Sequence, residues 1–198
     1  MDVAVVKLGV GNTASVLYAL ERLGARAVLT DEAGVISDAP RVILPGVGAA
    51  AHAMARIREL GLARVLRSFE RPLLGVCLGQ QILFERSAEG NAEGLGLLAG
   101  AVAALPVSPQ MISPHMGWSK LTPKREHALI DGVPAGAYAY FVHAYVCPLS
   151  AATLADATYG APFAAIVQQG NFMGCQFHPE RSGAVGARIL KNFLDMPC

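Results

Sequence analysis

Short apolar runs and amphipathic segments alternate along the first half of the chain. Short apolar runs are typical of buried strands. The amphipathic segments have apolar residues at helical spacing, and a glycine follows two of them, as at helix ends. The β-α-β-β-α-β-α order predicts an α/β fold with a mostly parallel central sheet covered by helices. The expected strands are 3–6, 27–29, 41–44 and 73–77, and the expected helices are 16–23, 50–60, 64–70 and a segment that follows the fourth strand.

The second half of the chain has a different pattern. Its apolar runs are separated by Gly, Pro and Asn, which predicts strands joined by hairpins and an attached antiparallel portion. An amphipathic helix is expected at 184–194. No linker, repeat or low-complexity tract interrupts the sequence, so we expect a single domain over residues 1–198. The expected strands of this half are 97–105, 118–121, 138–146, 163–168 and 172–177.

The composition narrows the class of protein. Of the 198 residues, 53% are hydrophobic and 16% charged, which predicts a folded chain with a sizeable core. A net charge of +1 gives no electrostatic reason to expect nucleic acid or an anionic membrane as a partner. Pro, Gly, Ser and His interrupt every long uncharged stretch, so no transmembrane span is expected. The first residues, 1–6, lack the basic region of a signal peptide.

The four cysteines form neither a C-x-x-C pair nor a disulfide framework. This usage predicts a reducing, cytoplasmic environment. No cluster of His and Cys has the spacing of zinc ligands, so we expect no metal and no cofactor.

Cys77 lies in the sequence Gly-Val-Cys-Leu-Gly, between an expected strand and an expected helix. This order is typical of a nucleophile elbow, in which the nucleophile occupies a strained turn and flanking glycines let the strand and helix approach closely. The N-terminus of the following helix favours a thiolate over a thiol. A buried structural cysteine is the alternative interpretation, because burial is a common fate of cysteine.

A cysteine nucleophile needs a base and a third group that orients the base. His178 and Glu180 flank Pro179, which favours extended backbone at His178. Residues two apart in extended chain point to the same side, so Glu180 could orient the imidazole of His178 toward Cys77. A surface turn with a solvated glutamate is the alternative.

An oxyanion formed by attack of the thiolate would need two hydrogen-bond donors. The backbone N–H of Leu78, directly after the cysteine, is one candidate. Val47 or Gly48, in a glycine-rich loop at the end of an expected strand, is the natural source of the second.

Three motifs together resemble those of the class I, or triad, glutamine amidotransferases, which have a flavodoxin-like fold. Within that family, the chain is more similar to the glutaminase subunits of imidazole glycerol phosphate synthase. The three shared motifs are Gly75-Val76-Cys77-Leu78-Gly79, Pro45-Gly46-Val47-Gly48 and Phe177-His178-Pro179-Glu180. The more specific motifs are 9–12, 87–90, 94–97, 114–118, 140–145 and 176–183.

The resemblance implies a reaction and a substrate. Cys77 would attack the side-chain amide of L-glutamine, and His178 would protonate the departing ammonia and then activate water against the thioester. Carried over by motif, the residues that would hold the glutamine are Gly48, Gln81 and the backbone of His143, Ala144 and Tyr145.

The resemblance also implies a partner. In these synthases the ammonia passes to a HisF-type (β/α)₈-barrel cyclase subunit, which makes imidazole glycerol phosphate and aminoimidazole carboxamide ribotide in histidine biosynthesis. The residues expected on the cyclase-facing surface are Asn12, Trp118, Tyr140 and Arg181. The chain departs from the usual family pattern at Lys7, Leu8, Thr13, Ala14, Ala144 and Arg181.

Alternatives remain at this stage for the function and for single residues. The glutaminase could supply ammonia to a different synthase, for surface sugars or pyridoxal phosphate, and a free-standing cysteine hydrolase or a non-catalytic binding module would use the same fold. Trp118 and Tyr140 could be core aromatics. His115 and His143 could be structural histidines with satisfied hydrogen bonds, and Cys147 and Cys175 are most simply buried small hydrophobic residues.

Overall fold

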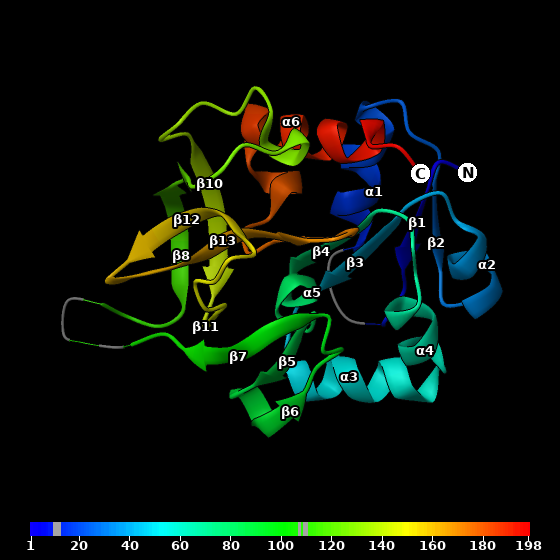
Figure 1. Ribbon diagram of the computed structural model, residues 1–198, viewed down its shortest axis with the longest axis horizontal. Coiled ribbons are helices and arrows are strands. Elements are labelled where there is room, and N and C mark those ends of the chain that lie inside the picture. Colours follow the sequence, from blue (N-terminus) through cyan, green and yellow to red (C-terminus); the bar gives the residue numbers. More distant parts are fainter. Residues whose placement is uncertain (10–12, 107, 109–110) are drawn as a thin grey trace.

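An eight-stranded sheet forms the centre of the computed structural model, which describes residues 1–9, 13–106, 108 and 111–198 (Figure 1). The first five strands in spatial order are mutually parallel, and the last three continue the sheet in antiparallel fashion. The predicted fold class is therefore confirmed. In spatial order the strands are β2 (Ala27–Thr30), β1 (Val3–Val6), β3 (Val42–Gly46), β4 (Leu73–Cys77), β14 (Phe172–Cys175), β13 (Ala161–Gln169), β12 (Thr153–Tyr159) and β9 (Thr122–Pro123).

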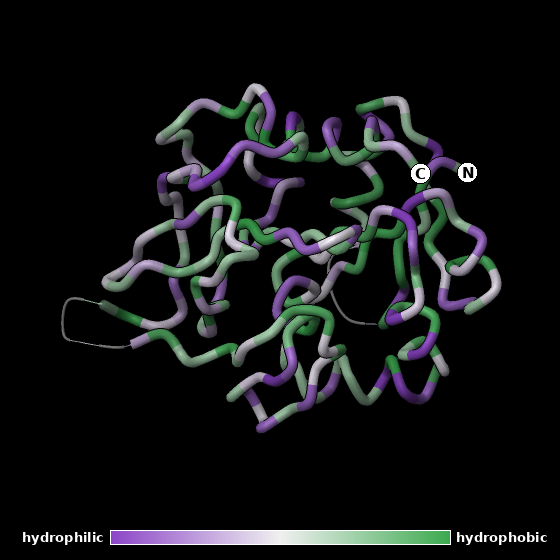
Figure 2. Tube along the Cα trace, viewed as in Figure 1, coloured by the Kyte–Doolittle hydropathy of each residue, from purple (hydrophilic) through white to green (hydrophobic). Residues whose placement is uncertain are grey.

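Helices cover both faces of this sheet, and alternate residues of each strand face opposite layers. Val3 and Val5 of β1 belong to the core that also contains residues of α1 (Thr13–Arg22) and α6 (Gly183–Asp195). Ala4 and Val6 belong to a second core with α2 (Ala33–Asp38), α3 (Ala50–Glu59) and α4 (Leu62–Arg67). Figure 2 shows hydrophobic residues concentrated along the central strands. Burial on both faces explains why the strands have uninterrupted apolar sequences.

Two smaller sheets flank the parallel strands. An antiparallel ribbon pairs β8 (His115–Lys120) with β10 (Tyr138–His143). A four-stranded sheet has the order β11 (Tyr145–Val146), β7 (Leu98–Ala104), β5 (Phe84–Ser87) and β6 (Ala92–Glu93). The remaining elements are the short helix α5 (Leu78–Gln81) and the 3₁₀ turns η1 (Glu89–Asn91), η2 (Ala128–Ile130) and η3 (Pro179–Arg181).

Three predicted strands of the second half pair differently from the expected hairpins. The strand expected over 138–146 is divided between β10 and β11, which belong to different sheets. The run 97–105 becomes β7, which pairs in parallel with β5 instead of forming a hairpin. The run 172–177 becomes β14, which joins the parallel sheet beside β4 as well as pairing with β13. Strand partners are set by tertiary packing, which local periodicity does not report.

Several helices and strands were not predicted. The missed elements are α2, β5, β6, β9 and β12. In α2 only Ile36 is buried, so the segment has no hydrophobic repeat for a periodicity argument to find. The predicted helix end at Gly61 is confirmed, because Gly61 has a left-handed φ of 68° between α3 and α4. Within the described residues, every helix is too short or too polar to cross a bilayer.

Candidate active site

Three loops meet at one edge of the parallel sheet. β3, β4 and β14 are consecutive, parallel strands, so their carboxyl ends lie at the same edge, where sites of α/β proteins form. Gly46 at the end of β3 is the register partner of Cys77 at the end of β4. The chain leaves β14 at Cys175 and reaches His178 three residues later. Segments that are about a hundred residues apart in sequence therefore lie side by side.

Cys77 forms the predicted elbow between β4 and α5. Its backbone has φ 55° and ψ −110°, a strained conformation for a residue with a side chain. A Cβ on Gly79 would lie 1.8 Å from the carbonyl oxygen of Leu44, and one on Gly75 would lie 2.5 Å from the oxygen of Gly79. Both glycines are therefore required by close backbone approach, as predicted. Cys77 is buried to 6% exposure but faces a pocket that His178 also lines.

His178 and Glu180 interact directly. The Nδ1 atom of His178 lies 2.8 Å from Oε1 of Glu180, and their side chains are only 12% and 4% exposed. His178 has the extended backbone predicted from the following proline, but Glu180 lies in the 3₁₀ turn η3 and not in extended chain. The two side chains thus meet as expected through a different backbone geometry. The bond directs the other ring nitrogen, Nε2, away from Glu180.

The electrostatics of the site favour a protonated His178. Burial alone would lower the pKa of the imidazole, but the hydrogen bonds and negative charges of Cys77 and Glu180 outweigh it and raise the pKa to about 10. A charged imidazolium beside a thiolate is the arrangement that cysteine nucleophiles require. The imidazolium of His178 is therefore available as a proton donor beside Cys77.

Backbone hydrogen bonds hold His178 against β10. The N–H of His178 donates to the carbonyl of Tyr140 at 2.9 Å. The hydroxyl of Ser182 donates to the carbonyl of His178 at 2.7 Å and accepts from the N–H of Tyr140 at 3.0 Å. Sequence reasoning gave Ser182 no role, although it lies in the motif 176–183. Ser182 makes no cap hydrogen bond to α6 and positions His178 instead.

The pocket beside Cys77 contains every residue predicted for the oxyanion and for substrate binding. It also contains Glu89 of η1, which was quoted in a motif but given no role. The half-buried Glu89 carboxylate accepts a hydrogen bond from the N–H of Ala50 at 2.8 Å, which holds it beside the pocket. Its signal in the sequence was the Ser-Ala-Glu-Gly motif. The lining residues are Val47, Gly48, Cys77, Leu78, Gln81, Glu89, Val142, His143, Ala144, Tyr145 and His178.

Two glutamines connect this pocket to its surroundings. Nε2 of Gln81 donates to the carbonyl oxygen of Tyr145 at 3.0 Å and to Oε1 of Gln176 at 3.1 Å. Nε2 of the fully buried Gln176 lies 3.9 Å from Sγ of Cys77. Gln176 was not predicted as a site residue, although it directly precedes the Phe-His-Pro-Glu motif. Both side chains constrain the shape of the pocket around the sulfur atom.

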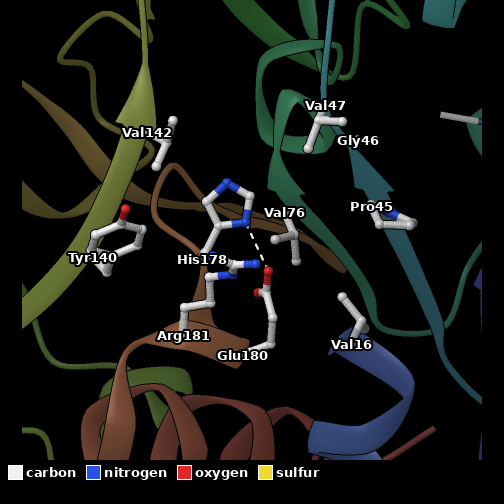
Figure 3. A pocket seen from close by; sticks show the side chains of 10 residues that line it. All are labelled: Val16, Pro45, Gly46, Val47, Val76, Tyr140, Val142, His178, Glu180 and Arg181. Atoms are coloured by element: carbon white, nitrogen blue, oxygen red, sulfur yellow. Dashed lines mark hydrogen bonds and ion pairs between the residues drawn. The ribbon is translucent and has the colours of Figure 1, made fainter. Parts of the chain in front are cut away.

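A second pocket lies on the other side of His178 (Figure 3). It shares Val47, Val142 and His178 with the Cys77 pocket, so these residues form the wall between the two. Its remaining walls are mostly apolar, with the exception of Glu180, Arg181 and Tyr140 at one side. In Figure 3 Tyr140 lies on β10, opposite the residues of β3. The pocket connects the surroundings of His178 with the edge of the β8–β10 ribbon.

The expected surface residues have different environments. Trp118 is 54% exposed and belongs to neither hydrophobic core, so the core-aromatic alternative is wrong for it. Tyr140, which is half-buried, contacts Trp118 edge to face with ring centroids 5.7 Å apart. Arg181 is exposed beside His178. Asn12 lies outside the described residues. The three described residues therefore cluster near the second pocket.

Cys147, Cys175, His115 and His143 are all buried. Burial raises the pKa of the Cys147 thiol to about 12 and raises that of Cys175 as well, so both are unreactive hydrophobic residues, as predicted. His115 and His143 hydrogen-bond to each other at 3.1 Å. Across the described residues, no three His, Cys, Asp or Glu side chains are arranged to hold a metal ion.

Comparison with known proteins agrees with this geometry. The sequence model of the family "Glutamine amidotransferase class-I" matches residues 5–196. The chain belongs to the class-I glutamine amidotransferase family. The resemblance inferred from the sequence motifs is thereby confirmed.

Curated relatives of this amidotransferase cover nearly the whole chain. It is 52% identical over 195 residues to "Imidazole glycerol phosphate synthase subunit HisH" of Xanthomonas axonopodis pv. citri (strain 306), covering 98% of both chains. It is 51% identical, with the same coverage, to the protein of that name in Xylella fastidiosa (strain Temecula1 / ATCC 700964). Among solved structures, "Crystal structure of glutamine amidotransferase" has a TM-score of 0.76 at 22% identity, covering 98% of each chain. "Structure of PurLQS from Thermotoga maritima" has a TM-score of 0.71 at 20% identity, covering 98% of this chain and 97% of that one, and supports the same fold.

Proposed function

We propose that this amidotransferase is the glutaminase subunit of an imidazole glycerol phosphate synthase, with Cys77, His178 and Glu180 as its catalytic triad. The observation that carries the proposal is that Cys77 and His178 line one pocket while Glu180 holds His178 from behind at 2.8 Å. The name shared by its relatives and their 51–52% identity over 98% of the chain support the choice of synthase.

The first half of the proposed reaction forms a thioester. The thiolate of Cys77 attacks the side-chain amide carbon of L-glutamine, and the C=O π bond opens to an oxyanion. His178, as imidazolium, donates its proton to the amide nitrogen, the C–N bond breaks, and ammonia leaves. The N–H of Leu78 at the start of α5, together with the backbone of Val47 or Gly48, would stabilise the oxyanion.

The second half regenerates the enzyme. His178, now neutral, removes a proton from water, and the hydroxide attacks the thioester carbonyl. The C–S bond then breaks, glutamate leaves, and Cys77 returns to thiolate beside a protonated His178. The sum is glutamine and water to glutamate and ammonia. Removing one oxyanion donor from such a site typically lowers the rate by about 10²–10³.

Charge and hydrogen bonding support glutamine as the substrate. Both N–H bonds of the Gln81 amide are used by Tyr145 and Gln176, so its amide oxygen remains for a ligand in the pocket. That oxygen and the carboxylate of Glu89 are suited to an α-ammonium group. Backbone groups of 143–145 and Gly48 complete the proposed glutamine site.

The second pocket supports a route for ammonia toward a partner. It lies behind His178, has mostly apolar walls and reaches Tyr140 and Arg181. Trp118 lies beside Tyr140, exposed on the same face of the ribbon. We propose that this surface docks a HisF-type (β/α)₈-barrel cyclase subunit that consumes the ammonia. The cysteines are unpaired, which suits a cytoplasmic enzyme.

A coupled assay tests this function. The full chain, a (β/α)₈-barrel cyclase subunit and its phosphoribulosyl ribonucleotide acceptor are expected to yield imidazole glycerol phosphate only when glutamine is added. Cys77→Ser should abolish ammonia release from glutamine without changing the thermal unfolding curve. If a glutamine-mimicking chloroketone leaves Cys77 unmodified in the complete mixture, the catalytic proposal is wrong. Ammonia release without cyclised product would instead contradict the choice of partner.

A further inference from the structure

A chain of hydrogen bonds, centred on two buried histidines, runs from the β8–β10 ribbon to the wall of the Cys77 pocket. Oγ of Ser119 lies 3.1 Å from Nε2 of His115, and Nδ1 of His115 lies 3.1 Å from Nε2 of His143. Nδ1 of His143 lies 2.9 Å from the carbonyl oxygen of Tyr145. His115 and His143 are register partners at one end of the ribbon, with 3% and 5% exposure. The mechanism above uses none of these side-chain contacts.

The terminal carbonyl fixes the direction of every bond in the chain. Because a carbonyl oxygen only accepts, Nδ1 of His143 must carry the hydrogen. Nε2 of neutral His143 is then an acceptor, so Nδ1 of His115 must donate to it. In neutral His115 the atom Nε2 is therefore an acceptor, and the hydroxyl of Ser119 donates to it. Burial lowers the pKa of His115 and lowers that of His143 to about 4, which keeps both rings neutral.

Aromatic rings surround the two histidines. His115 stacks on Phe141 at 5.3 Å and on Tyr159 at 4.2 Å between ring centroids. Phe163 contacts His143 edge to face at 5.0 Å. These rings have no strong hydrogen-bonding group directed at the imidazole nitrogens, so a nitrogen that loses its partner has no substitute among them. Unpaired buried polar groups are costly, and the chain therefore favours one arrangement.

The chain of hydrogen bonds ends at a backbone carbonyl that also orients Gln81. Tyr145 lies where the chain passes from β10 to β11, and its carbonyl oxygen accepts from both His143 at 2.9 Å and Gln81 at 3.0 Å. The second bond leaves the amide oxygen of Gln81 for the ligand, as described above. Rotation of this peptide would break both bonds, so its orientation affects the backbone of 143–145 and Gln81 together.

We propose that His115 and Ser119 are positioning residues, which act through His143 to hold the Tyr145 carbonyl and thereby set the affinity of the Cys77 pocket for glutamine. The inference rests on the proposed function and deepens it. The proposal also connects the β8–β10 ribbon with the substrate site. Trp118 lies on the exposed face of this ribbon, and Ser119, which follows it directly, points to the opposite face.

Saturable labelling of Cys77 by a glutamine-mimicking chloroketone tests the proposal on the full chain. It separates binding of the probe, KI, from the alkylation rate, kinact. His115→Phe keeps the stacked ring but removes the donor to His143, and we expect KI to rise about 10-fold with kinact within about threefold. His115→Asn places an amide N–H near the Nδ1 position, and we expect it to restore most of the affinity. Alkylation by iodoacetamide, which does not use the glutamine site, should be unchanged.

Two further variants guard against a purely structural explanation. Tyr159→Phe keeps the ring that stacks on His115 but removes a 2.8 Å hydrogen bond to the Ile112 carbonyl. This bond is not part of the Ser119–His115–His143–Tyr145 hydrogen-bond chain, so the KI of the variant should match that of the wild type. Ser119→Ala keeps all the stacked rings and removes only the hydrogen bond to Nε2 of His115, so it should raise KI about threefold or more and gives a test if His115→Phe fails to fold.

The outcomes separate this inference from the proposed function. If Cys77 of the wild type does not react with the chloroketone, the proposed function itself is wrong. If the wild type reacts but Ser119→Ala and a folded His115→Phe bind the probe as it does, the hydrogen-bond chain does not position the pocket. A folded His115→Phe with normal KI beside a His115→Asn with raised KI would show that ring packing is the requirement, and would overturn the proposal.

Discussion

Replacement of Glu180 by Gln tests the electrostatic reasoning most directly. The substitution keeps the size of the side chain but replaces the carboxylate, whose Oε1 lies 2.8 Å from Nδ1 of His178, with a neutral amide. Both side chains are buried, at 12% and 4% exposure, so solvent screens their interaction weakly. Within the described part of the chain, Oε2 of Glu180 is buried without a hydrogen-bond partner, so Glu180 acts on its surroundings mainly through His178.

The magnitude follows from the pKa of His178. Burial lowers this pKa, and the hydrogen bonds and charges of Cys77 and Glu180 more than compensate, raising it from 6.5 to about 10. The net rise corresponds to roughly 5 kcal/mol at about 1.36 kcal/mol for each pKa unit. Glu180 is one of the two groups responsible for this rise. We therefore expect Glu180→Gln to lower the pKa of His178 and to reduce the rate of glutamine hydrolysis by about 100-fold, a loss of roughly 3 kcal/mol.

The assay is the pH dependence of ammonia release by the complete enzyme with its barrel partner. Activity falls at high pH when His178 loses the proton that it donates to the leaving nitrogen, so Glu180→Gln should move this limb of the profile to lower pH. The stability of the fold should also decrease as the pH rises. A raised folded-state pKa stabilises the fold below pH 6.5, and this contribution is lost as the pH rises through about 10. The stability advantage of the wild type over Glu180→Gln should thus shrink across that window.

Glu59→Gln is the matched control, since Glu59 is exposed and pairs with Arg56 on the surface of α3. Its pH profile and unfolding curve should match those of the wild type, because exposed ion pairs contribute little. A high-pH limb that stays in place in Glu180→Gln, with a rate within threefold of wild type, would refute the assignment of Glu180 as the group that supports His178.

Three further predictions concern the elbow, the backbone of His178 and the surface. Gly79→Ala should lower the free energy of unfolding by about 3 kcal/mol or more in denaturant titrations, because its Cβ would lie 1.8 Å from a backbone oxygen. Gly34→Ala, whose Cβ would enter open space, is the control and should be neutral or stabilising. Ser182→Ala should lower kcat about 10-fold with little change in KM, because it frees the backbone of His178; an equal change in both constants would contradict this. Trp118→Ala should weaken binding of the barrel subunit about 10-fold in calorimetry and leave chloroketone labelling unchanged.

Much of the catalytic chemistry could be predicted from short stretches of sequence. Gly75 and Gly79 around Cys77 specify a strand-to-helix turn that no larger residue can occupy, so the elbow was evident without a structure. His178 and Glu180 are two residues apart in sequence. Because they are so close, their side chains meet even though the backbone forms a 3₁₀ turn instead of extended chain. Local sterics and local spacing decide such features.

Residues whose role depends on distant partners could not be predicted in this way. Ser182 looks like a helix cap but bonds to Tyr140 and His178, and Glu89 reaches the pocket through a hydrogen bond to α3. The sequence also could not decide whether Trp118 is exposed or buried, because an aromatic residue on an alternating strand suits either face. Each of these depends on which strands are neighbours.

The sequence by itself therefore determined the parallel strands of the first half, the strained cysteine and the local His–Glu pair, because steric fit and side-chain period act over a few residues. Only the tertiary structure decided that β14 lies beside β4, which brings His178 to the pocket of Cys77. It also decided the β8–β10 register that joins His115 to His143. Strand order and register are set by the packing of whole layers, and a linear pattern of apolar residues fits many such arrangements equally well.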